Sequence, residues 1–170
     1  IGDDMKIESF MKVDFSKNDV KPIWEFIGLE DCRVFRWDGK LYLCGVRRDT
    51  TPNGQGRMEL SELDLEIEDV LQVTSAGQKK LTRITKAQEV SRYRIPTPGP
   101  DNSYCEKNWM PVNDLPYHFV KWCNPTEVVK VDPENKITTQ VYHGNFVPKN
   151  LDYRGGSQVI KFGDHYIALT

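Results

Sequence analysis

The sequence has few residues of the kinds that build metal centres. Its three histidines are far apart in the chain, and none belongs to an HExxH-type motif. Its four cysteines are also widely spaced, and no two of them form a CxxC pair. We therefore expect no metal and no organic cofactor. The residues concerned are His118, His143 and His165, and Cys32, Cys44, Cys105 and Cys123.

The even number of cysteines permits two disulfides, but the surrounding pattern favours free thiols. Cys32 and Cys44 occupy positions in predicted strands where small buried hydrophobic residues are expected. Buried free thiols are typical of proteins in a reducing compartment. We therefore expect a cytoplasmic protein whose cysteines are unpaired.

The sequence also lacks a long apolar run and a strong net charge. The first absence argues against a membrane span, and a formal net charge of −2 argues against a nucleic-acid surface. One stretch is locally basic, and it fits a solvated face better than a binding surface. It consists of Lys79, Lys80, Arg83, Lys86, Arg92 and Arg94. A length of 170 residues with 38% hydrophobic content suits one domain with a core.

A hairpin pattern recurs along the chain. Asp38-Gly39 lies between two alternating runs, and both central residues of a type I′ turn need positive φ. The segment 158–169 aligns with 33–44 without a gap, and a weaker copy covers 107–122. Three related hairpins at intervals of about 50 to 75 residues predict β-propeller blades, which bury their faces against one another.

For the other segments, the sequence allows a coarse prediction of secondary structure. The alternation at 57–65 predicts a third strand of the first blade, whereas 67–94 fits either strands or a short helix. Two alternating runs at 126–132 and 137–142, with turn residues between them, predict a further hairpin. We also expect a strand at 7–15, an extended lead-in at 20–26 and a proline-rich loop at 95–103.

Three short motifs resemble blades of one enzyme family. Gly28-Leu29-Glu30-Asp31-Cys32-Arg33, followed by the hairpin sequence at 37–42, resembles the Gly-x-Glu-Asp-Pro-Arg blade of the β-mannoside phosphorylase and β-mannosidase family. The segments 106–111 and 154–158 resemble the Lys-Asn segment of a later blade and the blade after it. Members of this family are five-bladed propeller enzymes, so the resemblance implies an all-β, β-propeller fold.

The resemblance further implies that about three blades are present, as one partial propeller domain over 1–170 of a longer protein. Five blades need about 250 residues or more. A histidine that helps to bind phosphate in the family lies beyond the segments matched in this sequence. Cys32 stands where the family has proline, which frees a backbone N–H beside Asp31.

Asp31 is the candidate catalytic residue. Inverting cleavage of a glycoside needs a proton donor at the leaving oxygen and a water or phosphate on the opposite face of the sugar. The resemblance implies that Asp31 donates this proton, directly or through a substrate hydroxyl. The other interpretation is that Asp31 and Arg33 form a structural pair that caps the strand. Glu30 points to the face opposite Asp31 in an extended chain, so one of the two acids is structural.

The resemblance also implies positions that bind substrate. Arg57 and Lys107 match phosphate-binding positions best and Arg154 less closely, and a guanidinium can donate two parallel hydrogen bonds to phosphate. Surface salt bridges are the other interpretation of Arg57 and Arg154. Asn108 completes the Lys-Asn segment, and Glu30 and Arg33, beside the candidate acid, are further candidates for substrate binding, as is Trp109. The aromatic candidates, for stacking on sugar rings or for packing in the core, are Trp24, Tyr104 and Trp109.

The leading hypothesis is a glycoside hydrolase or phosphorylase that acts on β-mannoside-like oligosaccharides by inverting displacement, with inorganic phosphate as candidate co-substrate. The alternatives are a non-catalytic glycan-binding propeller module attached to a glycosyltransferase or another domain, and a purely structural interaction propeller. We expect no nucleic-acid and no membrane partner. Open sheet edges in a partial propeller predict a homo-oligomer, or pairing with missing blades of the same polypeptide.

Two structural expectations follow from this hypothesis. The hairpins at Asp38-Gly39, 133–136 and Gly163-Asp164 should be antiparallel, with helix below about 15% of residues. Asp31, Arg57 and Lys107 should converge on one cleft, because proton donation and anion binding act on the same bond.

Overall fold

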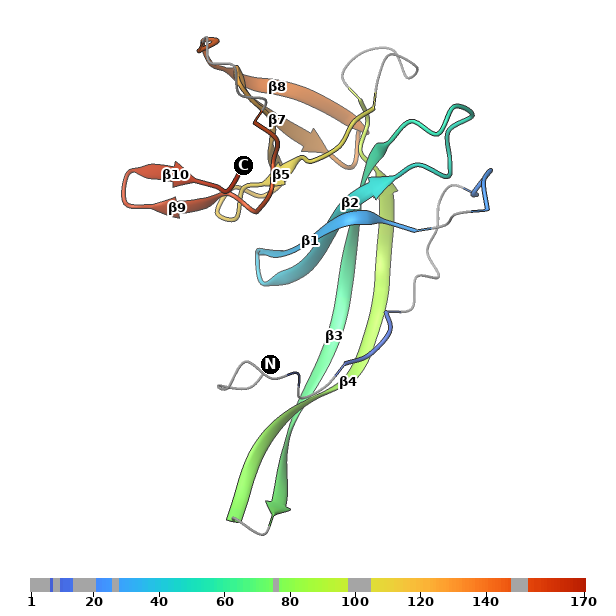
Figure 1. Cartoon of the computed structure of the whole chain (residues 1–170), viewed down its shortest axis with the longest axis vertical. Helices are drawn as coiled ribbons and strands as arrows, with labels where there is room; N and C mark the ends of the chain where they lie inside the picture. The colour runs from blue at the N-terminus through green and yellow to red at the C-terminus, as the bar shows by residue number, and fades with distance from the viewer. Residues whose placement is uncertain are drawn as a thin grey trace.

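All regular secondary structure in the described residues is β-strand (Figure 1). The computed structural model describes residues 7, 10–13, 21–25, 28–74, 77–97, 105–147 and 153–170. Ten strands and no helix lie within these ranges, which confirms the expected all-β chain. The strands are β1 (Glu30–Trp37), β2 (Lys40–Arg47), β3 (Arg57–Thr74), β4 (Gly77–Arg94), β5 (Met110–Pro111), β6 (His118–Cys123), β7 (Thr126–Asp132), β8 (Ile137–His143), β9 (Ile160–Phe162) and β10 (His165–Ile167).

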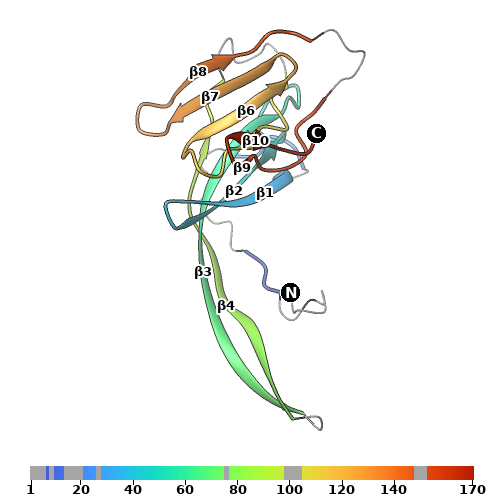
Figure 2. The same cartoon turned by 90° about the vertical axis from the view of Figure 1, so that its left-hand side faces the viewer.

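The strands form two four-stranded sheets and one two-stranded hairpin (Figure 2). The sheet orders are β1-β2-β3-β4 and β5-β6-β7-β8, and β9 pairs with β10. Within each of the two larger sheets, consecutive strands are antiparallel neighbours, so both sheets are meanders. Short connections favour this order, because a tight turn can join only adjacent antiparallel strands.

Turn chemistry accounts for the hairpins. Asp38 and Gly39 have φ values of 49° and 78°, as a two-residue type I′ turn between β1 and β2 requires. Antiparallel strands also flank the turns at 133–136 and Gly163-Asp164. The three predicted hairpins are therefore confirmed.

The third and fourth strands are much longer than the sequence predicted. The segment 67–94 forms the distal part of β3 and all of β4, so the short helix considered for it is absent. β2 pairs with β3 only as far as Leu63, and beyond this residue β3 and β4 project from the body as a two-stranded ribbon (Figures 1 and 2). Arg92 is buried, so the basic stretch is not one solvated face.

The first strand begins earlier than the sequence predicted and carries an irregularity. β1 starts at Glu30, and its register with β2 shifts between Glu30 and Arg33, where Asp31 has a φ of 50°. This bulge changes the side-chain alternation. Cys32 is consequently exposed, and the expectation that it is a buried strand residue is wrong, whereas Cys44 is fully buried.

Some predicted segments lie wholly or partly outside the described residues. Within 7–15, residues 7 and 10–13 are irregular rather than strand, and the others are outside the described ranges. Residues 21–25 of the lead-in contain bends. Residues 95–97 are irregular, as the proline-rich sequence predicted, and 98–103 are outside the description.

The main core lies between the two four-stranded sheets. Trp37 of β1 contacts Phe119 of β6, with ring centroids 5.4 Å apart, and its indole Nε1 donates to the Val112 carbonyl at 2.7 Å. Both sheets contribute the remaining buried side chains, which are Phe35, Tyr42, Cys44, Val46, Met58, Leu60, Ile95, Trp109, Val129 and Val131. The packing of these side chains fixes one sheet against the other.

Three strands that are far apart in sequence, β1, β5 and β9, lie close together. Val112, directly after β5, forms a parallel bridge with Val159, directly before β9, and both are buried with Met110 in a second core cluster. Gln158 donates from its side-chain amide to the Val34 carbonyl of β1 at 2.6 Å. β1, β5 and β9 are thereby linked although they are far apart in sequence.

Candidate functional site

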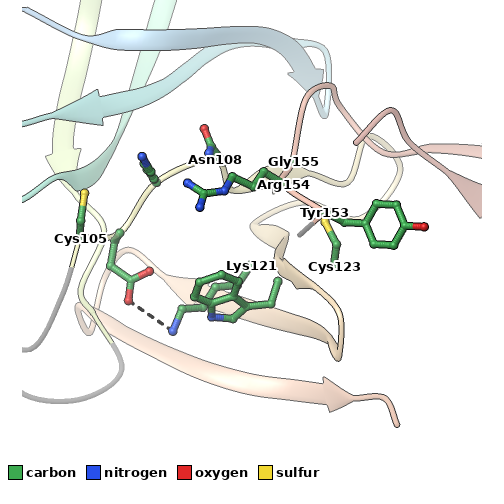
Figure 3. Close-up of a pocket in the computed structure, with 10 residues that line it drawn as sticks. Cys105, Asn108, Lys121, Cys123, Tyr153, Arg154 and Gly155 are labelled. Carbon is green, nitrogen blue, oxygen red and sulfur yellow. Dashed lines mark ion pairs between the residues drawn. The ribbon is translucent and has the colours of Figure 1, made fainter. Parts of the chain in front are cut away.

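A cavity of about 250 Å³ lies at the amino-terminal ends of β5 and β9 (Figure 3). Three chain segments line it: the approach to β5, the carboxyl end of β6 and the approach to β9. The lining residues are Cys105, Glu106, Lys107, Asn108, Lys121, Trp122, Cys123, Tyr153, Arg154 and Gly155. We call this cavity the cleft.

Backbone geometry brings two of these segments into contact. Asn108 has a φ of 61°, in the left-handed region that asparagine adopts more readily than most residues. The chain at Gly155 passes so close to Asn108 that a Cβ on Gly155 would overlap the Asn108 carbonyl oxygen. Arg33 of β1 holds the same segment, because its Nη2 donates to the Gly155 carbonyl at 2.7 Å. Gly155 is therefore required where the two walls meet.

A buried ion pair forms one side of the cleft. Lys121 Nζ lies 3.3 Å from Glu106 Oε1, and Trp109 Nε1 donates to Glu106 Oε2 at 2.9 Å. The Lys121 ammonium also lies 5.9 Å from the centre of the Trp109 ring, within the range of a cation–π contact. Figure 3 shows the ion pair as a dashed line, on the side of the cleft opposite Asn108 and Arg154. These contacts fix both charged side chains in position.

The rest of the cleft is more exposed and carries groups that can donate hydrogen bonds. Lys107 and Arg154 are exposed, and Asn108 is half-buried. Trp122 is 44% exposed and supplies aromatic surface, whereas the ring of Tyr153 points away from the other lining side chains (Figure 3). Cationic and amide donors beside an aromatic ring suit a polyhydroxylated ligand, which has both oxygen acceptors and apolar C–H faces.

The cleft also contains two thiols. Cys105 accepts a hydrogen bond from the Gly56 backbone N–H at 3.2 Å, which ties the approach to β5 to the start of β3. Burial raises the pKa of the Cys123 thiol, so this thiol is neutral near pH 7 and adds apolar surface.

The predicted catalytic acid lies at the bulge of β1. Asp31 and Glu30 are both exposed, and neither lines the cleft. Arg33 donates from Nη1 to the Asp31 backbone carbonyl at 3.1 Å, so the contact described between these residues uses the backbone of Asp31 and not its carboxylate. Since Arg33 also binds the Gly155 carbonyl, it connects the Asp31 backbone to the cleft wall.

Arg57 is placed elsewhere. It is 3% exposed, and it donates to the Gly56 carbonyl at 2.8 Å and to Gln55 Oε1 at 3.3 Å. It lines a second cavity, of about 410 Å³, together with Thr50, Thr51, Pro52, Asn53, Gln55 and Arg94. Arg57 and Lys107 thus lie in different cavities. The structure brings together Lys107, Asn108 and Arg154, and it does not bring Asp31, Arg57 and Lys107 into one cleft.

The aromatic candidates differ in their surroundings. Trp109 is 1% exposed and packs against Phe119, so it is a core residue with no face for a sugar. Trp24 is partly exposed and donates to the Thr51 carbonyl at 2.8 Å, outside the cleft. Tyr104 is outside the described residues.

Sequence reasoning missed Glu106, Lys121 and Trp122 as cleft residues. Lys121 follows the buried Phe119 at the two-residue spacing of a strand, so its inward position was readable from the alternation in β6. An inward lysine needs a buried partner, and this requirement pointed to an acid on the neighbouring segment.

Comparisons with known proteins add no assignment: no family model, no curated protein and no solved structure matches this chain. Among the residues that the structure describes, no group of three or more His, Cys, Asp or Glu side chains is arranged to hold a metal ion. Nor does any helix in the described part of the chain have the length and apolar character needed to span a membrane.

Proposed function

We propose that this chain forms the glycan-binding part of a carbohydrate-active β-propeller, of the glycoside hydrolase or phosphorylase type. The observation that carries the proposal is the cleft, in which Lys107, Asn108 and Arg154 gather at the ends of the first strands of two hairpins. Propeller enzymes bind ligands at such an end, because loops from successive blades meet there around the axis.

The strand arrangement supports a propeller. Four-stranded antiparallel meanders are the blade unit of this fold, and the two larger sheets have that order. In a propeller the first strand of each blade lies nearest the axis. Contacts between Val34 and Gln158, and between Val112 and Val159, bring the first strand segments together in the corresponding way.

The chemistry of the cleft favours a sugar ligand. Lys107 and Arg154 can donate to hydroxyl oxygens or to a phosphate, and the Asn108 side-chain amide can both donate and accept. The exposed part of the Trp122 ring offers an apolar surface to sugar C–H groups. The resemblance to mannoside-active enzymes makes a β-mannoside the preferred glycan.

For the enzymatic function, Asp31 is the proposed proton donor. It lies outside the cleft, so this function requires that the bond to be cleaved lies where the glycan leaves the cleft toward the bulge of β1. In inverting displacement the acid transfers its proton to the leaving oxygen as the glycosidic C–O bond breaks. Water or phosphate attacks the anomeric carbon from the opposite face and forms the new C–O bond. Inorganic phosphate is the proposed co-substrate for the phosphorylase, and its acceptor oxygens fit the Lys107 and Arg154 cations.

A second function, non-catalytic glycan binding, is favoured by the position of Asp31. Its side chain lines neither of the two cavities described above, and its backbone carbonyl is bound by Arg33. In this case the cleft binds the glycan without cleaving it, and the bulge at Asp31 only shapes the strand.

Calorimetric titration of the purified protein with a β-1,4-linked mannobiose tests both functions. Lys107→Ala should weaken binding about tenfold, because a hydrogen bond from a charged donor contributes about 1.5 kcal/mol or more. Asn108→Gly removes the amide and keeps the positive φ. Lys130→Ala, at an exposed position of β7 away from the cleft, is the matched control and should bind normally.

Turnover separates the enzyme from the binding module. Asp31→Asn should abolish release of mannose or mannose phosphate while mannobiose binding is retained, since only the proton is lost. Binding without turnover in the wild-type protein assigns the second function. Equal mannobiose affinity in wild type, Lys107→Ala and Asn108→Gly would contradict both.

A further inference from the structure

The second cavity, which Arg57 lines, is larger than the cleft and shares no lining residue with it. Its volume of about 410 Å³ lies in the range of pockets that hold small organic ligands. Its described lining residues include two arginines and no acid, and they are Thr50, Thr51, Pro52, Asn53, Gln55, Arg57 and Arg94. The charge of this lining favours an anionic ligand.

The two arginines lie on the same face of the first sheet. Arg57 and Glu59 are two residues apart in β3 and so point to the same face, and Arg94 of β4 pairs with Glu59 across the strands. Arg47 of β2 pairs directly with Arg57. Like charges in such a cross-strand pair repel each other. An anion beside this end of the sheet would reduce that repulsion.

Arg94 is held less tightly than Arg47, which lies on the same face. Arg47 Nε contacts Asp49 at 2.7 Å, whereas Arg94 Nη2 lies 3.9 Å from Glu59. Arg94 Nη2 also donates to the Thr50 hydroxyl oxygen. The Arg94 side chain is 27% exposed, and none of the hydrogen bonds described for it uses Nη1. Arg94 therefore has a donor left for a ligand.

The loop at 48–56 positions the other polar groups of the second cavity. Arg48 Nε donates to the Gly54 carbonyl at 2.9 Å, and Thr51 Oγ1 donates to the Gln55 carbonyl at 2.7 Å. The Thr50 hydroxyl accepts from Arg94, so its own hydrogen can be donated to a ligand. These bonds hold the loop in one shape before any ligand binds.

We propose that the second cavity binds a phosphate monoester of about the size of a monosaccharide. Arg94 Nη1 and the Thr50 hydroxyl donate to the phosphate oxygens, and Arg57 adds positive charge. A phosphate monoester carries about −1.5 to −2 charges near pH 7, so two lining arginines attract it more strongly than a carboxylate with one charge.

The size of the second cavity indicates a ligand larger than inorganic phosphate. A phosphate ion has five heavy atoms, and one water takes up about 30 Å³, so phosphate alone would leave most of the space unfilled. The Asn53 side-chain amide can bind hydroxyl groups of the rest of the ligand. This site is separate from the proposed glycan site, so either can fail without the other.

Titration of the isotope-labelled wild-type protein with glucose 6-phosphate tests the proposal. Backbone amides at 50–57 should show saturable chemical-shift changes, and this readout separates the second cavity from the cleft segments at 105–108, 121–123 and 153–155. Inorganic phosphate and glucuronate should bind more weakly at the same amides. Glucose, which has no charge, should not saturate them at the same concentrations.

Variants then test the donors. Arg94→Gln should weaken glucose 6-phosphate binding at 50–57 at least about tenfold, because a charged donor is lost. Thr50→Val keeps the side-chain shape and should weaken binding about threefold or more. Arg83→Gln makes the same change at an exposed position of β4 outside the second cavity, and should leave the affinity unchanged.

Several results would overturn the proposal. Glucose 6-phosphate might as well be absent if the amides at 50–57 show no saturable change. Equal or tighter binding of glucuronate would overturn the phosphate, and equal or tighter binding of inorganic phosphate would overturn the sugar-sized remainder. Equal weakening by Arg83→Gln and Arg94→Gln would show a response to net charge alone. Should Arg94→Gln fail to fold, Thr50→Val and the wild-type titrations still decide the outcome.

Discussion

The two four-stranded sheets use buried charge in different ways. In the first sheet, Arg47 contacts Asp49 at 2.7 Å, and Arg92 contacts both Glu89 at 2.7 Å and Glu59 at 3.3 Å. All five side chains are almost fully buried. Arg47 Nη1 also lies 3.6 Å from Glu59 Oε1, so the opposite charges of the cluster link β2, β3 and β4.

In the second sheet one buried pair, Lys121 with Glu106, forms part of the cleft wall. Exposed cations, Lys107 and Arg154, lie in the same cleft. This comparison teaches that burial of a charge does not by itself indicate function. What distinguishes the cleft is a fixed ion pair beside groups that remain accessible to a ligand.

Removing a charge from the first cluster should have the largest effect. Glu59→Gln keeps the shape of the side chain and leaves Arg47 and Arg92 with less negative charge, so it should destabilise the fold by about 3–5 kcal/mol. Urea denaturation measures this loss. Glu62→Gln, at a partly exposed pair with Lys40, is the control and should cost about 1 kcal/mol or less.

Equal destabilisation by these two variants would contradict the difference between the two sheets. The buried charges around Glu59 would then contribute no more to stability than an exposed ion pair does. Mannobiose affinity measured at a temperature where the Glu59→Gln protein is folded should match that of the wild type. The cluster and the cleft share no residue.

Adding a side chain at Gly155 should have the next largest effect. Gly155→Ala forces the approach to β9 away from Asn108, which should cost about 1–3 kcal/mol and weaken mannobiose binding. Gly163→Ala places alanine at a φ of 60° in the turn between β9 and β10, away from the cleft. It should lower stability and leave mannobiose affinity unchanged, and a similar affinity loss in both variants would argue against a local role for Gly155.

A buried thiol in the first sheet should produce the smallest effect over the range from pH 8 to pH 10. Burial raises the pKa of the Cys44 thiol from 9.0 to about 12. Between these two pH values the folded protein keeps the thiol proton, whereas the unfolded chain releases it. The stability that this proton contributes is complete below pH 9 and is lost as pH rises toward 12, by up to about 1.4 kcal/mol per pH unit.

Denaturant titrations at several pH values between 8 and 10 measure this slope. Cys44→Ala should be less stable at pH 8 because of the small cavity, but its stability should fall less steeply with pH than that of the wild type. An unchanged slope would show that other groups, such as the half-buried Tyr93 with its raised pKa, carry the whole dependence.

Local signals in the sequence predicted the hairpins well. Asp38-Gly39 specifies its turn through two positive φ values, and this requirement acts over two residues. The two-stranded ribbon that β3 and β4 form beyond Leu63 was not predictable in the same way. Its apolar residues have no core to cover them, and the opposite charges of its strands become meaningful only once Glu66 is known to lie opposite Lys86.

The candidate site was predictable in part. Lys107, Asn108 and Arg154 were identified through the family resemblance, and the structure places them in one cleft. Glu106 and Lys121 were missed, because their pairing depends on how β6 lies against the approach to β5. The cavity of Arg57 could not be foreseen either, since it depends on the fold of the loop at 48–56.

Backbone amide chemical shifts during titration with β-1,4-linked mannobiose test the central claim most directly. The account predicts saturable shifts concentrated in the three cleft segments, at 105–108, 121–123 and 153–155, with little change at 50–57 around Arg57. Shifts concentrated around Arg57, or no saturable shifts at any segment, would contradict the assignment of the cleft as the glycan site.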